Sequence, residues 1–218
     1  MRSLVAARAA RALADAPVLD DVARERIWRA FMAGEIRVAE RRSAGASVVF
    51  LARARPEVAR AALDARARAV AELVGAGLAY KEVAFQLGIS NASVWRAIAA
   101  ACRVMGLAHR MDLAILAAAL GPHRGAADHR CVRCARAELA GAELLALEAS
   151  VSASPIWDRL SDAERAVTEL ALAGHGDEAI ARLRGARSPR TVANQLDHVF
   201  RKAGVSGRVQ LVTRLVAG

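Results

Sequence analysis

The 218-residue sequence predicts a mostly α-helical fold, with two similar four-helix units and a small N-terminal segment of helices and one β-hairpin. Three observations support this prediction. Hydrophobic residues make up 55% of the chain and aromatic residues only 4%, and alanine and leucine, both strong helix formers, dominate. Residues typical of strands are concentrated in one short stretch. A segment of about 55 residues occurs twice, which indicates a repeated unit.

Two helices are predicted before the hairpin. The first spans residues 3–16 and ends at Pro17, because proline interrupts a helix. The second begins at Asp20 and Asp21, whose side chains suit a helix N-cap, and ends before Gly34. It places four apolar side chains mostly on one side: Val22, Ile27, Trp28 and Phe31.

The only strand signal in the sequence predicts a β-hairpin. Residues 35–42 alternate apolar and charged side chains, residues 43–45 suit a turn, and residues 46–53 are apolar and β-branched. Pro56 ends the second strand, so residues 1–58 are assigned to one N-terminal unit. We expect its aromatic residues to form a small core against the next unit rather than a sensory pocket, because about 55 residues are few for a ligand-binding domain.

The repeat aligns residues 63–113 with residues 160–211, with one extra residue in the second copy near residues 185–187. Matched pairs run along the whole segment and include Arg68 with Arg165, Val83-Ala84 with Ile180-Ala181, Ser90 with Ser188, Arg103 with Arg201, and Gly106 with Gly204. Matching of this density indicates a duplicated unit. We assign the first copy to residues 59–120 and the second to residues 158–218.

Each copy is predicted to form four helices. In the first copy, a short helix at residues 81–87, a three-residue turn with Gly88 and a longer helix at residues 91–105 make a helix-turn-helix. Ser90 is placed to cap the longer helix and Gly106 to end it. The predicted fold class is therefore mostly α, with two four-helix helix-turn-helix domains.

Residues 121–157 are expected to form a linker that is partly helical, with the helix over residues 135–149. This linker contains weak candidates for a zinc site, because thiolates and imidazoles are preferred zinc ligands. They are His129, Cys131 and Cys134, with His123 nearby. A lone Cys-x-x-Cys pair is more often a chance pattern than a metal site, so no metal and no cofactor are assigned.

The second copy contains several short motifs. They are Glu164-Arg165, Ala173-Gly174, Ala179-Ile180-Ala181, Ser188-Pro189-Arg190-Thr191-Val192 and Lys202-Ala203-Gly204-Val205. With these motifs the second copy resembles the LuxR/FixJ-type helix-turn-helix domain, and the first copy is similar and has the usual turn length. The resemblance covers roughly half of the chain. It implies a bacterial transcriptional regulator that inserts the third helix of a unit into the major groove of double-stranded DNA.

The resemblance also implies which side chains contact DNA. In the second copy these are Ser188, Arg190, Thr191, Asn194, Gln195, His198, Arg201 and Lys202, and in the first copy Lys81, Ser90, Ser93 and Arg96. Asparagine and glutamine pair bidentately with adenine, and arginine pairs with guanine. Alanines occupy much of the third helix of the first copy, so we expect the second copy to read DNA sequence better.

Charge favours a polyanionic partner, because the formal net charge is +10 and the pI is about 11.1. Each copy carries an excess of three basic residues. Only Lys81 and Lys202 are lysines, and a high-GC genome produces such an arginine bias without any function. The charge therefore supports DNA binding without establishing it.

The sequence contains no P-loop, Gly-x-Gly-x-x-Gly or Gly-x-Ser-x-Gly motif, so an enzyme is not expected. It shows no secretory signal and no apolar run long enough to cross a bilayer, and its three cysteines argue against a disulfide framework. We therefore expect a cytoplasmic protein without a membrane partner.

Two alternative functions remain open. Residues 80–84 also resemble the fourth region of sigma factors, although no segment resembles the other sigma regions. The second alternative is a protein-interaction adaptor, in which degenerate helix-turn-helix folds serve for homodimerisation or for contact with RNA polymerase. The alanine-rich third helix of the first copy favours this adaptor.

Overall fold

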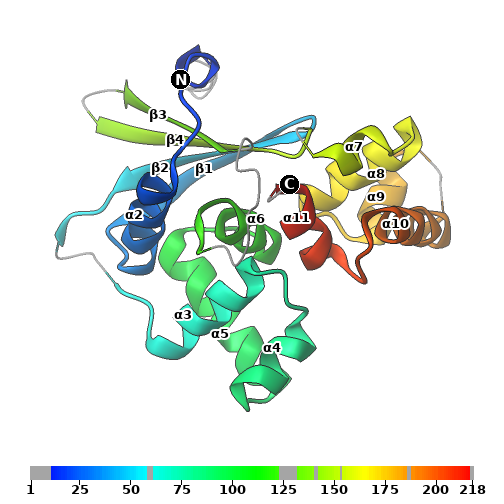
Figure 1. Ribbon diagram of the computed structural model, residues 1–218, viewed down its shortest axis with the longest axis horizontal. Helices are drawn as coiled ribbons and strands as arrows, with labels where there is room; N and C mark the ends of the chain where they lie inside the picture. Colours follow the sequence, from blue (N-terminus) through cyan, green and yellow to red (C-terminus); the bar gives the residue numbers. More distant parts are fainter. Residues whose placement is uncertain are drawn as a thin grey trace.

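A computed structural model describes residues 11–57, 61–122, 132–139, 142–152, 154–185 and 188–216. These residues form a helix-rich fold with one antiparallel sheet of four strands (Figure 1). The elements are α2 (Asp21–Met32), β1 (Ile36–Ala44), β2 (Ser47–Ala54), α3 (Ala65–Gly75), α4 (Tyr80–Leu87), α5 (Asn91–Met105), α6 (Arg110–Leu120), β3 (Val132–Leu139), β4 (Ala142–Ser150), α7 (Pro155–Asp158), α8 (Asp162–Leu172), α9 (Asp177–Leu183), α10 (Pro189–Ala203) and α11 (Arg208–Val216). Among these elements, no helix combines the length and the apolar character needed to cross a lipid bilayer.

The second predicted helix and the hairpin lie where the sequence predicts them, whereas residues 3–10 of the first predicted helix lie outside the described residues. Asp20 caps α2, because its Oδ1 accepts a hydrogen bond from the Ala23 amide over 2.7 Å, and β1 pairs with β2 as a hairpin. Trp28, Phe31 and Phe50 are buried in the same core as the first copy, so the expected packing core is confirmed. Val22 is the exception on α2, because 66% of it is exposed.

The sheet has strand order β1-β2-β4-β3, and both of its faces are covered. Alternate residues of the central strand β2 contact opposite layers: Val48, Phe50 and Ala52 face the helices. Leu51 faces the other way and packs on Leu13 of the N-terminal segment. Figure 1 shows that segment on one side of the sheet and the helices on the other.

The predicted helix at residues 135–149 is wrong, because this region forms the strands β3 and β4. β4 pairs with β2 from Ser47 with Ser150 to Arg53 with Leu144, so its partner lies about a hundred residues away in the chain. A strand covered on both faces lacks the alternation of polar and apolar residues that reveals a surface strand. The Leu-Leu-Ala-Leu run of β4 therefore looked helical by composition, and tertiary pairing overrode this local preference.

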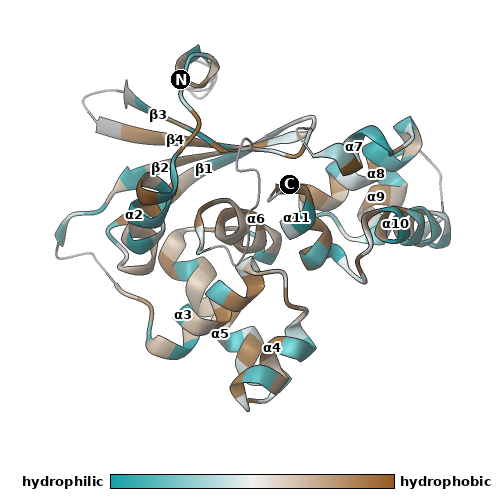
Figure 2. Cartoon of the chain, in the orientation of Figure 1, coloured by the Kyte–Doolittle hydropathy of each residue, from teal (hydrophilic) through white to brown (hydrophobic). Residues whose placement is uncertain are grey.

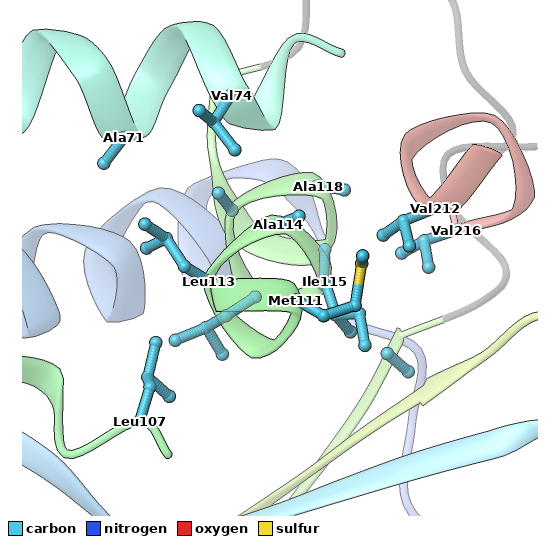
Figure 3. Packing of buried hydrophobic residues seen from close by; sticks show 14 of the residues in the cluster. Ala71, Val74, Leu107, Met111, Leu113, Ala114, Ile115, Ala118, Val212 and Val216 are labelled. Atoms are coloured by element: carbon cyan, nitrogen blue, oxygen red, sulfur yellow. The ribbon is translucent and has the colours of Figure 1, made fainter. Parts of the chain in front are cut away.

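Helix α6 is the centre of the helical layer. Every residue from Met111 to Leu120 is buried, as expected for a helix that is apolar on all sides. Figure 3 shows Met111, Leu113, Ala114, Ile115 and Ala118 of α6 between Ala71 and Val74 of α3 and Val212 and Val216 of α11. Helix α6 thus joins the first copy to the last helix of the second copy.

A buried ion pair connects the sheet to both copies. The pairing of β1 with β2 shifts by one residue between Val38 and Glu40, so Arg41 lies opposite Phe50, whose side chain faces the helices. Arg41 Nε donates to Oδ1 of the fully buried Asp112 on α6 over 2.9 Å. Its Nη2 donates to the Leu172 carbonyl at the end of α8 over 2.9 Å.

The electrostatics of Asp112 show that this pair does not simply add stability. Burial raises the pKa of Asp112, and the Arg41 guanidinium and the His109 amide act against that rise. The cost of desolvating the carboxylate is therefore not fully recovered. Removing one partner alone leaves the other charge buried and unpaired, and this is the more damaging change.

We predict that Asp112→Ala lowers the free energy of unfolding by about 3–5 kcal/mol, because it leaves Arg41 without its counter-charge. Chemical denaturation at pH 7 measures the change. The control is Glu25→Ala, which breaks the exposed Arg29–Glu25 pair and is expected to cost less than about 1 kcal/mol. The double variant Arg41→Met with Asp112→Leu should recover most of the stability. If Asp112→Ala and Glu25→Ala lowered the free energy of unfolding equally, this role of Asp112 would be contradicted.

Candidate nucleic-acid interface

The two copies have the same succession of helices, α3–α6 and α8–α11, and the same caps on their third helices. Ser90 Oγ accepts a hydrogen bond from the Ser93 amide over 3.2 Å at the start of α5. Ser188 Oγ accepts one from the Thr191 amide over 3.1 Å at the start of α10. Because these hydroxyls occupy the free amides of the first turn, both helices begin at the residues that the sequence predicts.

Equivalent arginines tie the fourth helix to another helix of the same copy, to the second helix α9 in the second copy and to the third helix α5 in the first. In the second copy Arg208 pairs with Asp177 and donates to the His175 carbonyl over 2.5 Å. In the first copy Arg110 lies 4.9 Å from the ring centroid of Trp95, and that ring packs edge-on against Tyr80 at 4.8 Å. The arginine of the first copy thus makes a cation–π contact, whereas the equivalent arginine of the second copy makes an ion pair.

The exposed face of α10 carries a stripe of four polar side chains. Arg190, Asn194, His198 and Arg201 are all exposed, and their spacing of three or four residues places them on one side of the helix. None of the four side chains has a hydrogen-bond or ion-pair partner within the described parts of the chain. Figure 2 shows α10 as a predominantly hydrophilic helix. We call these four residues the α10 stripe.

The other predicted contact residues of the second copy are already engaged. The Ser188 and Thr191 hydroxyls are 2.9 Å apart and serve the cap, and Gln195 Oε1 accepts from Arg184 Nη1 over 2.6 Å. Lys202 Nζ lies 2.6 Å from Glu164 Oε2 and also donates to the Arg159 carbonyl over 3.1 Å. Lys202 therefore supports the fold and is not available for a phosphate in this conformation.

The matching face of α5 is poorer in polar groups. The α10 stripe aligns with Ala92, Arg96, Ala100 and Arg103, so only two of the four positions keep a side chain that can bind DNA. Arg96 Nη2 donates to Ser93 Oγ over 3.1 Å, and Ser93 in turn contacts the Ser90 cap. Lys81 on α4 is exposed, whereas the second copy has the acidic Glu178 at that position.

The turns that precede α5 and α10 differ in length, but each begins with a glycine in the left-handed conformation. Gly88 and Gly185 have φ values of +62° and +72°, which matches them across the repeat. The extra residue of the second copy then falls at residues 186–187, outside the described residues. Arg184 takes the position of Leu87 and bonds to Gln195, so a polar link to α10 stands where the first copy has an apolar contact.

The weak zinc candidates are not brought together by any described geometry. His123, His129 and Cys131 lie outside the described residues. Cys134 is half-buried on β3, and burial raises the pKa of its thiol to about 11, so it is protonated at neutral pH. Within the described ranges, no group of three or more possible metal ligands occurs.

Comparison with known proteins gives no match: no family model, no curated protein and no solved structure is similar to this chain.

Glu164 links the start of α8 to the end of α10 and allows a prediction of pH dependence. Burial alone would raise its pKa, but Lys202 and the Ser161 amide and hydroxyl hold the pKa of Glu164 below its usual value. A lowered pKa means that this stability is present above the unfolded pKa of about 4.3 and is lost as the pH falls through the folded pKa.

We predict that Glu164→Gln lowers the free energy of unfolding by about 1–2 kcal/mol at pH 7, since a charged hydrogen bond to Lys202 is lost. The difference in free energy of unfolding between Glu164→Gln and the wild type should shrink as the pH falls below about 4. Urea denaturation across this pH range tests it, with the exposed Glu178→Gln as a control of equal charge change. If this difference stayed constant with pH, the stabilising role of the ionised Glu164 beside Lys202 would be contradicted.

Proposed function

We propose that this protein binds double-stranded DNA in a sequence-specific manner and regulates transcription, with both copies acting as helix-turn-helix domains of the LuxR/FixJ type. The α10 stripe is the single observation that carries the proposal. Four exposed polar side chains that have no partner among the described residues, on one face of a capped helix, are suited to reading the edges of bases.

The chemistry of the stripe fits the major groove. Arg190 lies in the first turn of α10, and the first residues of a recognition helix approach the bases most closely. An arginine donates two hydrogen bonds to guanine, and Asn194, one turn later, pairs bidentately with adenine. Arg201 lies near the other end of α10, where a cation meets the phosphate backbone.

Electrostatics supports the same partner. The chain has a net charge of +10, and each copy carries an excess of three basic residues. Phosphate contacts release counterions, so the affinity should fall steeply with salt concentration. Because one small unit contacts few bases, useful specificity needs both copies or a homodimer.

A second candidate function is contact with a protein, as an adaptor or with RNA polymerase, and Phe85 favours it. This side chain is 91% exposed on α4, beside a groove lined by Leu78, Lys81 and Gln210. A large aromatic side chain this exposed is more typical of a protein interface than of a solvated helix. Failure of the chain to retain any DNA at low salt would favour this candidate.

We predict that Arg190→Ala and Asn194→Ala each weaken binding to selected DNA by about 10- to 100-fold, since a bidentate base contact contributes about 1–3 kcal/mol of discrimination. Fluorescence anisotropy with a selected duplex measures the affinity. The control Arg26→Ala removes the same charge from α2 and should have little effect. Arg96→Ala on α5 should change the affinity less than Arg190→Ala, and the reverse ranking would contradict the unequal roles of the copies.

A second prediction concerns two neighbouring cations. Arg201→Ala should reduce the slope of log affinity against log salt by about 1, because one phosphate contact is lost. Lys202→Ala should leave the slope unchanged, because Glu164 already holds this lysine. Binding is measured between 50 and 300 mM salt at a temperature where both variants are folded. If Lys202→Ala changed the slope and Arg201→Ala did not, the assignment of Arg201 to phosphate and of Lys202 to Glu164 would be ruled out.

A further inference from the structure

The two copies contact each other through their fourth helices. Val212 and Val216 of α11 pack against the α6 surface that includes Met111 and Ala118 (Figure 3). Helices α6 and α11 occupy equivalent positions in the repeat. An interface in which two copies use the same element is the mark of an isologous, two-fold contact.

Equivalent glycines of the two copies each lie against the other copy. Gly77 and Gly174 match across the repeat and have φ values of +86° and +87°. A Cβ at Gly77 would lie 3.3 Å from Thr213 Cβ on α11, and a Cβ at Gly174 would lie 3.1 Å from His109 Cγ at the start of α6. The corner after the first helix of each copy therefore lies against the fourth helix of the other copy or the residue that caps it, at the middle of α11 in one case and at the start of α6 in the other.

The third residue of each fourth helix, Asp112 on α6 and Gln210 on α11, also lies near the other copy. Asp112 on α6 is bridged by Arg41 to the Leu172 carbonyl, which belongs to the corner of the second copy. Its equivalent, Gln210 on α11, lines a groove together with Gly77 and Leu78, which belong to the corner of the first copy. Each fourth helix thus begins beside the other copy's corner.

We propose that this chain is an internal pseudo-dimer, in which one polypeptide binds two DNA half-sites in inverted orientation at one fixed spacing. The inference rests on the proposed DNA-binding function. A two-fold relation between recognition helices is mirrored by an approximately palindromic site. The α6–α11 interface leaves Arg96 on α5 and the α10 stripe exposed, and Figure 1 shows α5 and α10 on opposite sides of the α6–α11 pair.

The half-sites are unequal because the two reading faces are unequal. The α10 stripe specifies more bases than α5, where alanines replace Arg190 and His198. The site of α5 should therefore have fewer specified positions and depend more on phosphate contacts, with Arg103 and Lys81 as cations. The selected sequence should be a palindrome that is strong in one half and weak in the other.

The test uses the purified full chain and a library of duplexes with a random core of about 30 base pairs. Selected duplexes are sequenced, and the stoichiometry of the complex is measured by sedimentation. The spacing is then changed by inserting about 5 or about 10 base pairs, which correspond to half a turn and a full turn of the duplex. A duplex with only the strong half-site is the matched control.

The proposal expects one chain per duplex and inverted half-sites. Either insertion should weaken binding to the level of the single half-site, at least 10-fold below the intact site, because a rigid pair cannot follow the half-sites apart. Directly repeated half-sites, two chains per duplex, or full affinity after a full-turn insertion would overturn it while leaving DNA binding intact. No enrichment of any duplex would overturn both this inference and the proposed function.

Discussion

The contact of Arg41 with Asp112 is the constraint on which the arrangement of the whole chain depends. A one-residue shift in the β1–β2 pairing directs Arg41 into the helical layer, where it meets a carboxylate that is fully buried. The same guanidinium bonds to the end of α8, so one side chain fixes the sheet, the first copy and the second copy relative to one another. Because burial raises the pKa of Asp112, we regard the pair as a device of specificity more than of stability.

The two copies keep the same order of helices although their sequences differ. The equivalent residues Arg110 and Arg208 hold the fourth helix to different helices of their own copies, Arg110 to α5 through an aromatic ring and Arg208 to α9 through a carboxylate. The buried Glu164, paired with Lys202, corresponds to Ala67 in the first copy, where no charge needs a partner. The copies therefore differ in their contacts but share the order of helices and the serine cap at the start of the third helix.

Local signals in the sequence predicted most of the helices, and the capping serines and aspartates marked their starts correctly. The pairing of β4 with β2 could not be predicted, because no local signal specifies a partner so distant and the buried strand resembles a helix in composition. In the candidate interface, Arg190, Asn194 and His198 are exposed as predicted, whereas Lys202 is not free. Its partner Glu164 lies 38 residues earlier in the chain, so spacing alone could not reveal the pair.

Nuclear magnetic resonance on the full chain tests most directly whether α10 reads DNA, as we propose. A selected duplex is titrated into isotope-labelled protein, and backbone and side-chain signals are followed. If α10 reads DNA, the largest shifts occur at Arg190, Asn194 and His198, with smaller shifts on α5 around Arg96. Shifts confined to the surface of α4 around Phe85, or no shifts at all, would contradict it.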